Sequence, residues 1–250
     1  MNKDIIIHGD CLIEMQRIPD KSVDLVLCDL PYGVLNKGNI HAKWDSVIPF
    51  EPLWEQYRRI IKDNGAIVLF AQGMFTANLM VSNQDVWKYN LIYKKGNSVT
   101  GFLNARRMPL RNHEDICVFY KKLPTYNPQM CESDERHYRN NPSKKISCYG
   151  HIGERIRTSS NEYFPKSIID IPKEPQLYHP TQKPVLLLEY LIKTYTDEGD
   201  TVLDNTCGSG STLVACVNAN RHYIGIEKEK EYYDISVKRV SEAKSKLSVC

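Results

Sequence analysis

Short aliphatic segments that end at a carboxylate recur along this chain of 250 residues. Residues 23–28 are bounded by turn formers and stop at Asp29, a pattern typical of a buried parallel strand rather than a helix. Residues 4–10, 201–204 and 223–227 repeat the pattern. Because helical patterns separate these segments, the sequence predicts an α/β fold with a mostly parallel sheet. The acids would then line the sheet edge at which ligands bind.

Further periodic segments predict the elements that complete the sheet and cover both of its faces. Helices are expected over 11–18, from 51 to a stop at 63–65, and over 73–82, 184–193, 211–219 and 230–246, and strands over 66–70, 86–95 and 116–121. A polar loop at 96–114 joins the last two strands. From about 122 to 178 the chain has few aliphatic residues, which predicts a lobe or a set of loops that adds nothing to the core.

Cysteine usage and the lack of long apolar runs bear on the compartment. The 8 cysteines are scattered without a Cys-x-x-Cys pair, so they are expected to be buried in a reducing compartment and to bind no metal. No apolar segment reaches the length of a membrane span, and residues 1–4 lead into a strand with no signal-peptide pattern. The sequence therefore predicts a cytoplasmic protein without a membrane partner.

A carboxylate, a proline and an aromatic ring follow the strand predicted at 23–28. Pro31 lacks a backbone donor and biases Leu30 toward an extended conformation, so the Leu30 carbonyl is expected to face a ligand. This carbonyl and the Asp29 carboxylate could hold an exocyclic amine while Tyr32 stacks on the ring that carries it. Such a grip aims the nitrogen lone pair at an electrophile. The same residues could instead form an ordinary turn at a strand exit.

A glycine-rich loop, Asp204 to Gly210, links a predicted strand to a predicted helix, where backbone amides and the helix dipole favour an anion. Glu227 ends the next strand, where an acid usually receives a ribose hydroxyl. Leu213 replaces the third small residue of a dinucleotide site, and no Lys follows the glycines as a P-loop requires. S-adenosyl-L-methionine fits this pattern, with Asp10 available for its adenine amine. Asp10 could equally be a plain helix N-cap.

Several motifs, and the order in which they occur along the chain, resemble those of the amino-group DNA methyltransferases of the permuted β class. Asp29-Leu-Pro-Tyr32 is similar to the family's Asp-Pro-Pro-Tyr catalytic motif, and residues 204–212 to its glycine-rich cofactor motif. His-Pro-Thr-Gln-Lys-Pro at 179–184 is similar to the segment that leads into the first cofactor-side helix. Residues 223–227 resemble the ribose-binding strand and residues 9–11 the adenine-contacting turn. The likeness covers nearly the whole chain outside 122–178.

Two departures from the family pattern stand out. Leu30 replaces the first proline of the catalytic motif, but the carbonyl needed there belongs to the backbone, so activity is expected to survive. Asn205 and Thr206 stand where the family often has Pro and Phe, which removes an aromatic surface beside the cofactor. Cofactor affinity is the property that this second departure puts in question.

The resemblance implies a circularly permuted, Rossmann-like methyltransferase fold with helices on both faces of the sheet. It divides the chain into a catalytic half (1–121), an inserted target-recognition lobe (122–178) and a cofactor-binding half (179–250). The implied catalytic residues are Asp29, Leu30, Pro31 and Tyr32. The implied cofactor contacts are Asp10, Cys11, Asp29, Thr181, Lys183, Asp204, Gly208, Ser209, Gly210, Ser211 and Glu227. Two of these also have plainer readings, because Lys183 could be an ordinary exposed lysine and Ser211 a helix cap.

The implied reaction moves a methyl group from S-adenosyl-L-methionine to N6 of an adenine flipped out of duplex DNA. Cytosine N4 is the close alternative, because its amine has similar geometry and the family more often has Ser there in place of Asp29. A catalytically silent DNA-binding protein of the same fold is a rival from another class, and an RNA or protein methyltransferase is a third. The intact acid, proline and ring argue against the silent protein.

Basic residues predict where DNA would bind. Residues 121–160 hold eight Lys or Arg and four acids, a net charge of +4, while the chain as a whole carries +3. Phosphate contacts are expected from Lys144, Lys145, Arg155 and Arg157 in this block and, by the resemblance, from Arg106, Arg107 and Arg111, which otherwise read as a solvated turn. The resemblance also brings a homodimer and a cognate restriction nuclease into view as partners, without fixing an interface or a recognition sequence.

Overall fold

The computed structural model describes residues 3–34, 45–132, 161–175, 178–179 and 181–247. The chain divides into two units, one made of Met1–Asn127 with Ser167–Cys250 and the other of Pro128–Lys166. In its described part, the second unit contains the antiparallel pair of β6 (Cys131–Glu132) and β7 (Glu162–Tyr163). The first unit contains the sheet that carries the candidate site.

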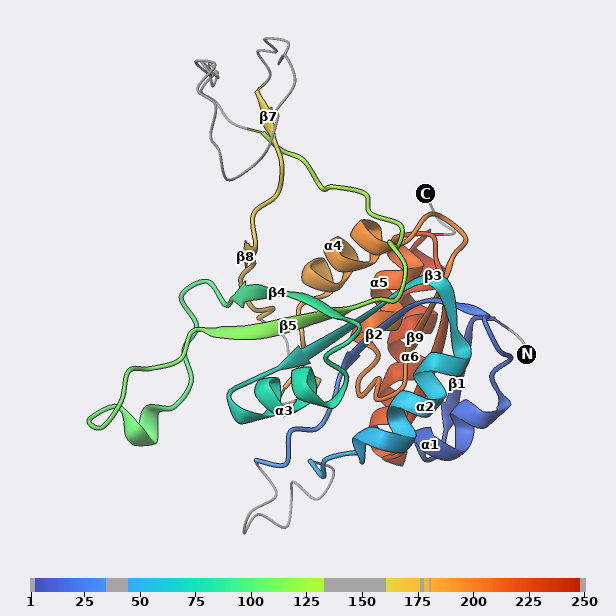
Figure 1. Cartoon of the computed structure of the whole chain (residues 1–250), viewed down its shortest axis with the longest axis horizontal. Helices are drawn as coiled ribbons and strands as arrows, with labels where there is room; N and C mark the ends of the chain where they lie inside the picture. The colour runs from blue at the N-terminus through green and yellow to red at the C-terminus, as the bar shows by residue number, and fades with distance from the viewer. Residues whose placement is uncertain (1–2, 35–44, 133–160, 176–177, 180, 248–250) are drawn as a thin grey trace. The chain divides into compact units, whose positions relative to one another are not determined.

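An 8-stranded sheet with the order β1-β10-β9-β2-β3-β5-β4-β8 forms the centre of the first unit (Figure 1). In that order the strands are Ile5–His8, His222–Glu227, Thr201–Asp204, Val23–Asp29, Ile61–Ala71, His113–Phe119, Trp87–Lys94 and Ile168–Asp170. Among these described strands, β5 is the one that runs antiparallel to its neighbours. The mostly parallel α/β sheet predicted from the sequence is therefore confirmed. β9 and β10 lie between β1 and β2 although they come last in the chain, so the order is permuted.

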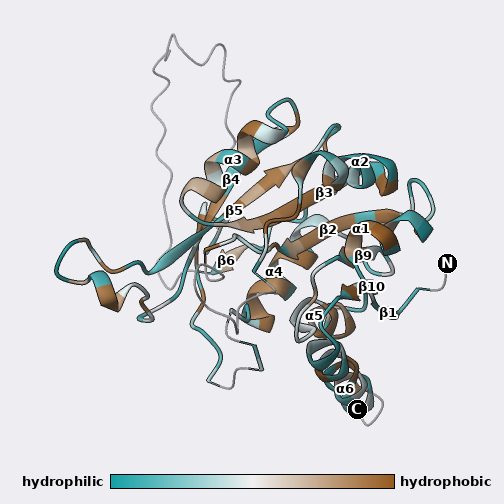
Figure 2. Ribbon diagram, turned by 90° about the horizontal axis from the view of Figure 1, so that it is seen from below, coloured by the Kyte–Doolittle hydropathy of each residue, from teal (hydrophilic) through white to brown (hydrophobic). Residues whose placement is uncertain are grey.

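Helices cover both faces of this sheet. One face packs against α1 (Cys11–Glu14), α2 (Phe50–Ile60) and α3 (Met74–Ser82), and the other against α4 (Val185–Tyr195), α5 (Ser211–Asn218) and α6 (Lys230–Leu247). Successive side chains of β2 alternate between the two, since Leu25 and Leu27 join the α4–α6 cluster and Val26 and Cys28 join the α1–α3 cluster. Figure 2 shows these central strands as hydrophobic ribbons. Burial on both faces explains the continuous aliphatic run that the sequence shows.

The helix expected from 51 ends sooner than predicted. α2 buries Leu53, Trp54, Tyr57 and Ile60 on one face, as its periodicity indicates, but it stops at Ile60 rather than at residues 63–65. Those three residues belong to β3. A side chain at position 65 would place its Cβ 2.7 Å from the backbone oxygen of Asp24, so the glycine there serves the close approach of β3 to β2 and not a helix cap.

Three other elements differ from the sequence-based prediction. The helix predicted over 11–18 is a short α-helix followed by the 3-10 turn Met15–Arg17, η1. β5 begins at His113, three residues before the predicted strand, because pairing with β4 continues to that point. The expectation that 122–178 adds nothing to the core is wrong for β8, which pairs with β4 and buries Ile169.

Within the residues that the structure describes, no helix combines the length and the apolar character needed to cross a bilayer.

Candidate active site

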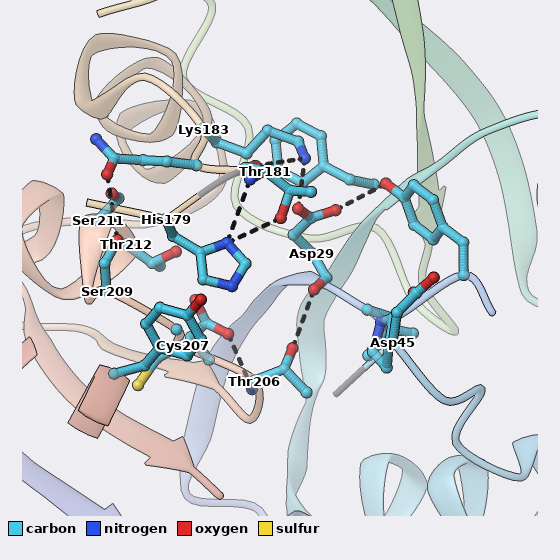
Figure 3. Close-up of a pocket in the computed structure, with 18 of the residues that line it drawn as sticks. Asp29, Asp45, His179, Thr181, Lys183, Thr206, Cys207, Ser209, Ser211 and Thr212 are labelled. Carbon is cyan, nitrogen blue, oxygen red and sulfur yellow. Dashed lines mark hydrogen bonds and ion pairs between the residues drawn. The ribbon is translucent and has the colours of Figure 1, made fainter. Parts of the chain in front are cut away.

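A cavity of about 470 Å³ lies at the sheet edge where the parallel strands end, a volume typical of sites for small ligands and cofactors (Figure 3). The acids predicted to share this edge, Asp10, Asp29, Asp204 and Glu227, all line it. So do the rest of the predicted catalytic motif and most other predicted cofactor contacts, namely Leu30, Pro31, Tyr32, Cys11, Thr181, Lys183, Gly208, Ser209 and Ser211. The structure therefore brings the two predicted halves of the site into one cavity.

The catalytic motif lies where β2 leaves the sheet. Oδ1 of Asp29 accepts a hydrogen bond from the Tyr32 hydroxyl at 2.7 Å, and its Oδ2 accepts one from the Lys183 ammonium. The Tyr32 ring packs against Phe75, with 4.9 Å between the ring centroids. The turn that follows is held by Asp45, a buried side chain that accepts from the backbone N–H of Gly33 at 3.0 Å. Sequence reasoning missed Asp45, whose role depends on a contact across a turn.

The glycine loop takes a shape that other residues resist. Gly208 has φ of 51° and Gly210 has φ of 80°, both in the left-handed region. A Cβ at position 210 would lie 2.8 Å from Cβ of Ser236, so the loop also packs too closely on α6 for a side chain. Gly210 is not among the residues that line the cavity. Its glycine is explained by this local geometry, and a direct cofactor contact for it stays a prediction.

Buried acids flank the loop. Glu227 accepts from the backbone N–H groups of Gly208 and Glu229, each at 2.8 Å, and burial raises the pKa of Glu227. Burial likewise raises the pKa of Asp204 to about 7, although Asp204 also accepts from the N–H of Thr206 at 3.1 Å. Both acids are held by backbone amides rather than by lysine or arginine side chains in the interactions described. A cationic ligand would favour their ionised forms.

Asp10 combines two features in the free protein. Its carboxylate accepts from the N–H of Leu12 at 3.0 Å and so caps α1, as expected from the sequence. It also lies 3.3 Å from the ammonium of Lys228 and lines the cavity. The cap role is therefore compatible with a ligand contact.

The side chain of Thr206, one of the departures from the family pattern, joins the two halves of the cavity. Its hydroxyl donates to the backbone oxygen of Asp29 at 3.2 Å (Figure 3). Asn205 precedes it in the chain, and its side-chain oxygen accepts from the Tyr57 hydroxyl at 2.6 Å. Polar contacts thus occupy the place of an aromatic packing surface.

Lys183 does not lie where an exposed lysine would. Its side chain is 7% exposed, and its ammonium contacts Asp29 (Figure 3). The same ammonium lies 3.2 Å from Oε2 of Glu114. The reading of Lys183 as an ordinary surface residue is therefore wrong. Glu114 in turn lies 2.5 Å from Nζ of Lys95. Sequence reasoning missed both Glu114 and Lys95, because it placed them in or next to a polar loop.

Residues that hold the 179–184 segment and the glycine loop were also missed. Glu174 accepts from the backbone N–H of Val185 and from the Gln182 side chain, each at 2.6 Å, and so fixes the start of α4. Arg239 of α6 donates to the Ser209 backbone oxygen at 2.7 Å and to the Ser211 hydroxyl at 3.0 Å. Neither residue belongs to a motif, so the sequence carries no signal that would have found them.

The predicted DNA contacts fall into two groups. Arg106, Arg107 and Arg111 lie on an exposed arm, here defined as residues 101–112, which projects from the ends of β4 and β5 (Figure 1). The arm includes the 3-10 turn Phe102–Asn104 and is closed by paired backbone hydrogen bonds between Thr100 and Arg111. Lys144, Lys145, Arg155 and Arg157 lie outside the described residues.

Comparison with known proteins finds relatives over nearly the whole chain. A family model described as DNA methylase, of the N6/N4 methyltransferase type, matches residues 23–238. The chain is 29% identical to the Type II methyltransferase M.HinfI of Haemophilus influenzae, over 96% of this chain and 68% of that protein. It is 28% identical to the Type II methyltransferase M2.MboI of Moraxella bovis, over 95% of this chain and 87% of that protein.

Solved structures share the same fold. The complex of M1.HpyAVI with SAM matches with a TM-score of 0.62 and 25% identity, covering 94% of this chain and 98% of that one. PvuII DNA methyltransferase, which is described as cytosine-N4-specific, matches with a TM-score of 0.68 and 16% identity, covering 99% of this chain and 93% of that one. The second likeness concerns the fold alone.

Proposed function

Since the chain belongs to the N6/N4 DNA methylase family, we propose that it transfers a methyl group from S-adenosylmethionine to N6 of adenine in duplex DNA. One observation carries the proposal. The Asp29-Leu-Pro-Tyr32 motif and the glycine loop with Glu227 line a single cavity, so an amine held by the first can meet a methyl donor held by the second.

The residues of the cavity fit the cofactor. The left-handed backbone of Gly208 opens a loop of amides at the start of α5, which suits a carboxylate. The carboxylate oxygens of Glu227 accept hydrogen bonds from the backbone N–H groups of Gly208 and Glu229. Each oxygen keeps a second lone pair that could accept from a ribose hydroxyl. Asp10 and Cys11 would meet the adenine end, and Thr181 also lines the cavity. Bound S-adenosylmethionine supplies an electrophilic methyl group.

In this proposal the chain's own residues hold and orient the target base. Asp29 and the Leu30 carbonyl accept the N–H groups of the flipped amine, and Tyr32 offers a ring face to the base. The exchange of an N–H for an N–CH₃ bond releases one proton. Asp29 is our candidate to accept it, because burial raises the pKa of this carboxyl and so makes it a better base. No cysteine nucleophile is needed.

Adenine is preferred to cytosine on the strength of Asp29, and the two are separated by product analysis. Unmethylated plasmid DNA is incubated with cofactor that carries a labelled methyl group, and the DNA is then digested to nucleosides. Label in N6-methyl-2′-deoxyadenosine supports the proposal. Label in N4-methyl-2′-deoxycytidine moves the protein to the cytosine class, and the absence of label from DNA supports the silent DNA-binding alternative.

The proposal also includes a target-recognition lobe, a cognate restriction nuclease and a homodimer. Residues 122–178, which include the second unit, would form the target-recognition lobe between a catalytic half at 1–121 and a cofactor half at 179–250. The relatives M.HinfI and M2.MboI are Type II methyltransferases, which supports a cognate restriction nuclease that recognises the same sequence. A homodimer stays a prediction, and sedimentation with and without DNA measures it.

A further inference from the structure

Both carboxylate oxygens of Asp29 hold a donor in the free protein. Oδ1 accepts the Tyr32 hydroxyl at 2.7 Å, and Oδ2 accepts the Lys183 ammonium (Figure 3). An ammonium is a charged nitrogen donor, so Lys183 takes the kind of position that a neutral target amine needs. Each oxygen keeps a second lone pair, but a target amine that binds Oδ2 has to share the charge of that oxygen with the Lys183 ammonium, so the two donors compete.

Lys183 has a second carboxylate within reach. Its Nζ lies 3.2 Å from Oε2 of Glu114, and Oε1 of Glu114 lies 2.5 Å from Nζ of Lys95. The exposed fractions of the four side chains are 3% for Lys95, 7% for Lys183, 13% for Glu114 and 23% for Asp29, so solvent screens them little. Their formal charges cancel. Lys183 thus lies between two carboxylates that share it.

The two carboxylates differ in how firmly they hold their charge. Burial raises the pKa of Asp29, and Lys183 offsets that effect only in part. Burial also acts to raise the pKa of Glu114, but Lys183 and Lys95 together outweigh it and hold this pKa below its usual value. The surroundings of Glu114 therefore favour its ionised form, whereas burial disfavours the ionised form of Asp29. Glu114 offers Lys183 the more lasting counter-charge.

We propose that Lys183 is a displaceable occupant of the amine site on Asp29, and that Glu114, held by Lys95, receives Lys183 when a target amine takes its place. The inference rests on the proposed function, because it requires a base amine to bind Asp29. Glu114 and Lys95 act through Lys183 and are positioning residues. The ammonium stays paired throughout the exchange, so the cavity avoids the cost of an unpaired buried charge.

Removing Lys95 and removing the Lys95–Glu114 pair have opposite consequences. In Lys95→Met, Glu114 loses its competing lysine and draws Lys183 away from Asp29, so the target amine meets less competition. In Lys95→Met/Glu114→Gln, both charges leave together and Lys183 keeps Asp29 as its carboxylate. The amine then competes with a more firmly held ammonium. A purely structural role predicts the reverse order, because only the single variant leaves a buried charge short of a partner.

The test compares kcat/KM for unmethylated plasmid DNA at saturating cofactor. Lys95→Met should match or exceed the wild type, and the double variant should fall about tenfold or more below Lys95→Met, the scale of one charge-assisted hydrogen bond. Lys94→Met is the matched control, since it removes the lysine next to Lys95 in the chain, whose side chain is 45% exposed and pairs with Asp170, and it should match the wild type. A double variant at least as active as Lys95→Met overturns the inference.

Folding is checked by melting temperature and by cofactor affinity in every variant. If Lys95→Met does not fold, Glu114→Gln is compared with Glu114→Gln/Lys183→Gln, which lacks the competing ammonium. The inference requires the second to be faster by about threefold or more, the lower range of coupling between contacting residues. Equal or slower turnover overturns it. An inactive wild type contradicts the proposed function itself, whereas an active wild type with the reversed order contradicts this inference alone.

Discussion

At the scale of single residues, Asp29 is the side chain on which the proposed reaction depends most directly. We expect Asp29→Ala to lower methyl transfer on the order of 10³-fold, because the target amine loses its acceptor and its base. Lys183 retains Glu114 as a partner in this variant, so the fold should survive. Cofactor affinity, measured by calorimetry, should stay within several-fold of the wild type. Near-normal turnover would remove Asp29 from the catalytic assignment.

Tyr32→Phe separates the two roles proposed for Tyr32, which are to stack its ring on the base and to orient the Asp29 carboxylate with its hydroxyl. The variant keeps the ring and deletes the hydroxyl that donates to Asp29, so a loss of about tenfold is expected from one hydrogen bond to a charged group. Single-turnover rates measure it. A loss as large as that of Asp29→Ala would mean that the hydroxyl does more than orient the carboxylate.

The raised pKa of Asp204 predicts that the protein releases a proton when the cofactor binds. This pKa is raised to about 7 by burial, so at about pH 6 the free protein holds this carboxyl mostly protonated. The cationic cofactor in the same cavity favours the ionised form, so binding should release on the order of one proton and affinity should rise as the pH rises toward 7. Calorimetry in two buffers of different ionisation enthalpy counts the proton. Asp204→Asn should abolish the release, and an unchanged count would assign the proton to another group.

At the scale of elements, the basic arm at 101–112 is expected to affect how DNA affinity depends on salt concentration. Neutralising Arg106, Arg107 and Arg111 to Gln should weaken DNA binding and flatten the slope of log K against log salt by about 0.9 for each DNA phosphate that the arm no longer neutralises. All three side chains are exposed, so the melting temperature should hardly change. Leu103→Ser is the control, because Leu103 is fully exposed on the same arm and carries no charge. An unaltered slope in the triple variant would make the arm a solvated turn.

Strands with a strong local signal could be predicted, and those made by tertiary pairing could not. Residues 23–28 and 201–203 are mostly aliphatic and are followed by Asp29 and Asp204, so both the strands and their shared edge followed from the sequence. His-Glu-Asp at 113–115 has low strand propensity, and it extends β5 because β4 pairs with it. Glu114 was missed for this reason. β8 has only 3 residues and is likewise too short to be found without its partner.

The candidate site shows the same division. The carboxylates at strand ends and the glycine loop carry local patterns, and the cavity contains them as expected. The pairing of Lys183 with Asp29 joins residues 154 positions apart, and the contact of Arg239 with Ser209 joins residues 30 apart on different elements. Side-chain contacts of this kind leave no periodic trace in a sequence. They depend on which elements the sheet order brings together.

At the scale of the whole molecule, the two units divide the proposed work. Among the residues that the structure describes, those that line the cavity all belong to the unit made of Met1–Asn127 and Ser167–Cys250. Replacing residues 128–166 with a short Gly/Ser linker should therefore leave cofactor affinity within several-fold while sequence-specific methylation is lost. Calorimetry and methylation mapping on plasmid DNA measure the two properties. Loss of cofactor binding in a protein that melts cooperatively would show that the smaller unit supports the cavity.

The position of β9 beside β2 also determines how long β2 has to wait for this partner during synthesis of the chain. These neighbours in the sheet are separated by most of the chain, so at about 5–20 residues per second a ribosome needs roughly 9 to 34 seconds between them. Throughout that interval the growing polypeptide exposes an unpaired edge that will later lie at the centre of the sheet, and such edges invite aggregation. A truncated mRNA would yield a polypeptide that lacks β9, in which this edge of β2 stays unpaired. We therefore expect truncated chains to aggregate unless they are degraded quickly.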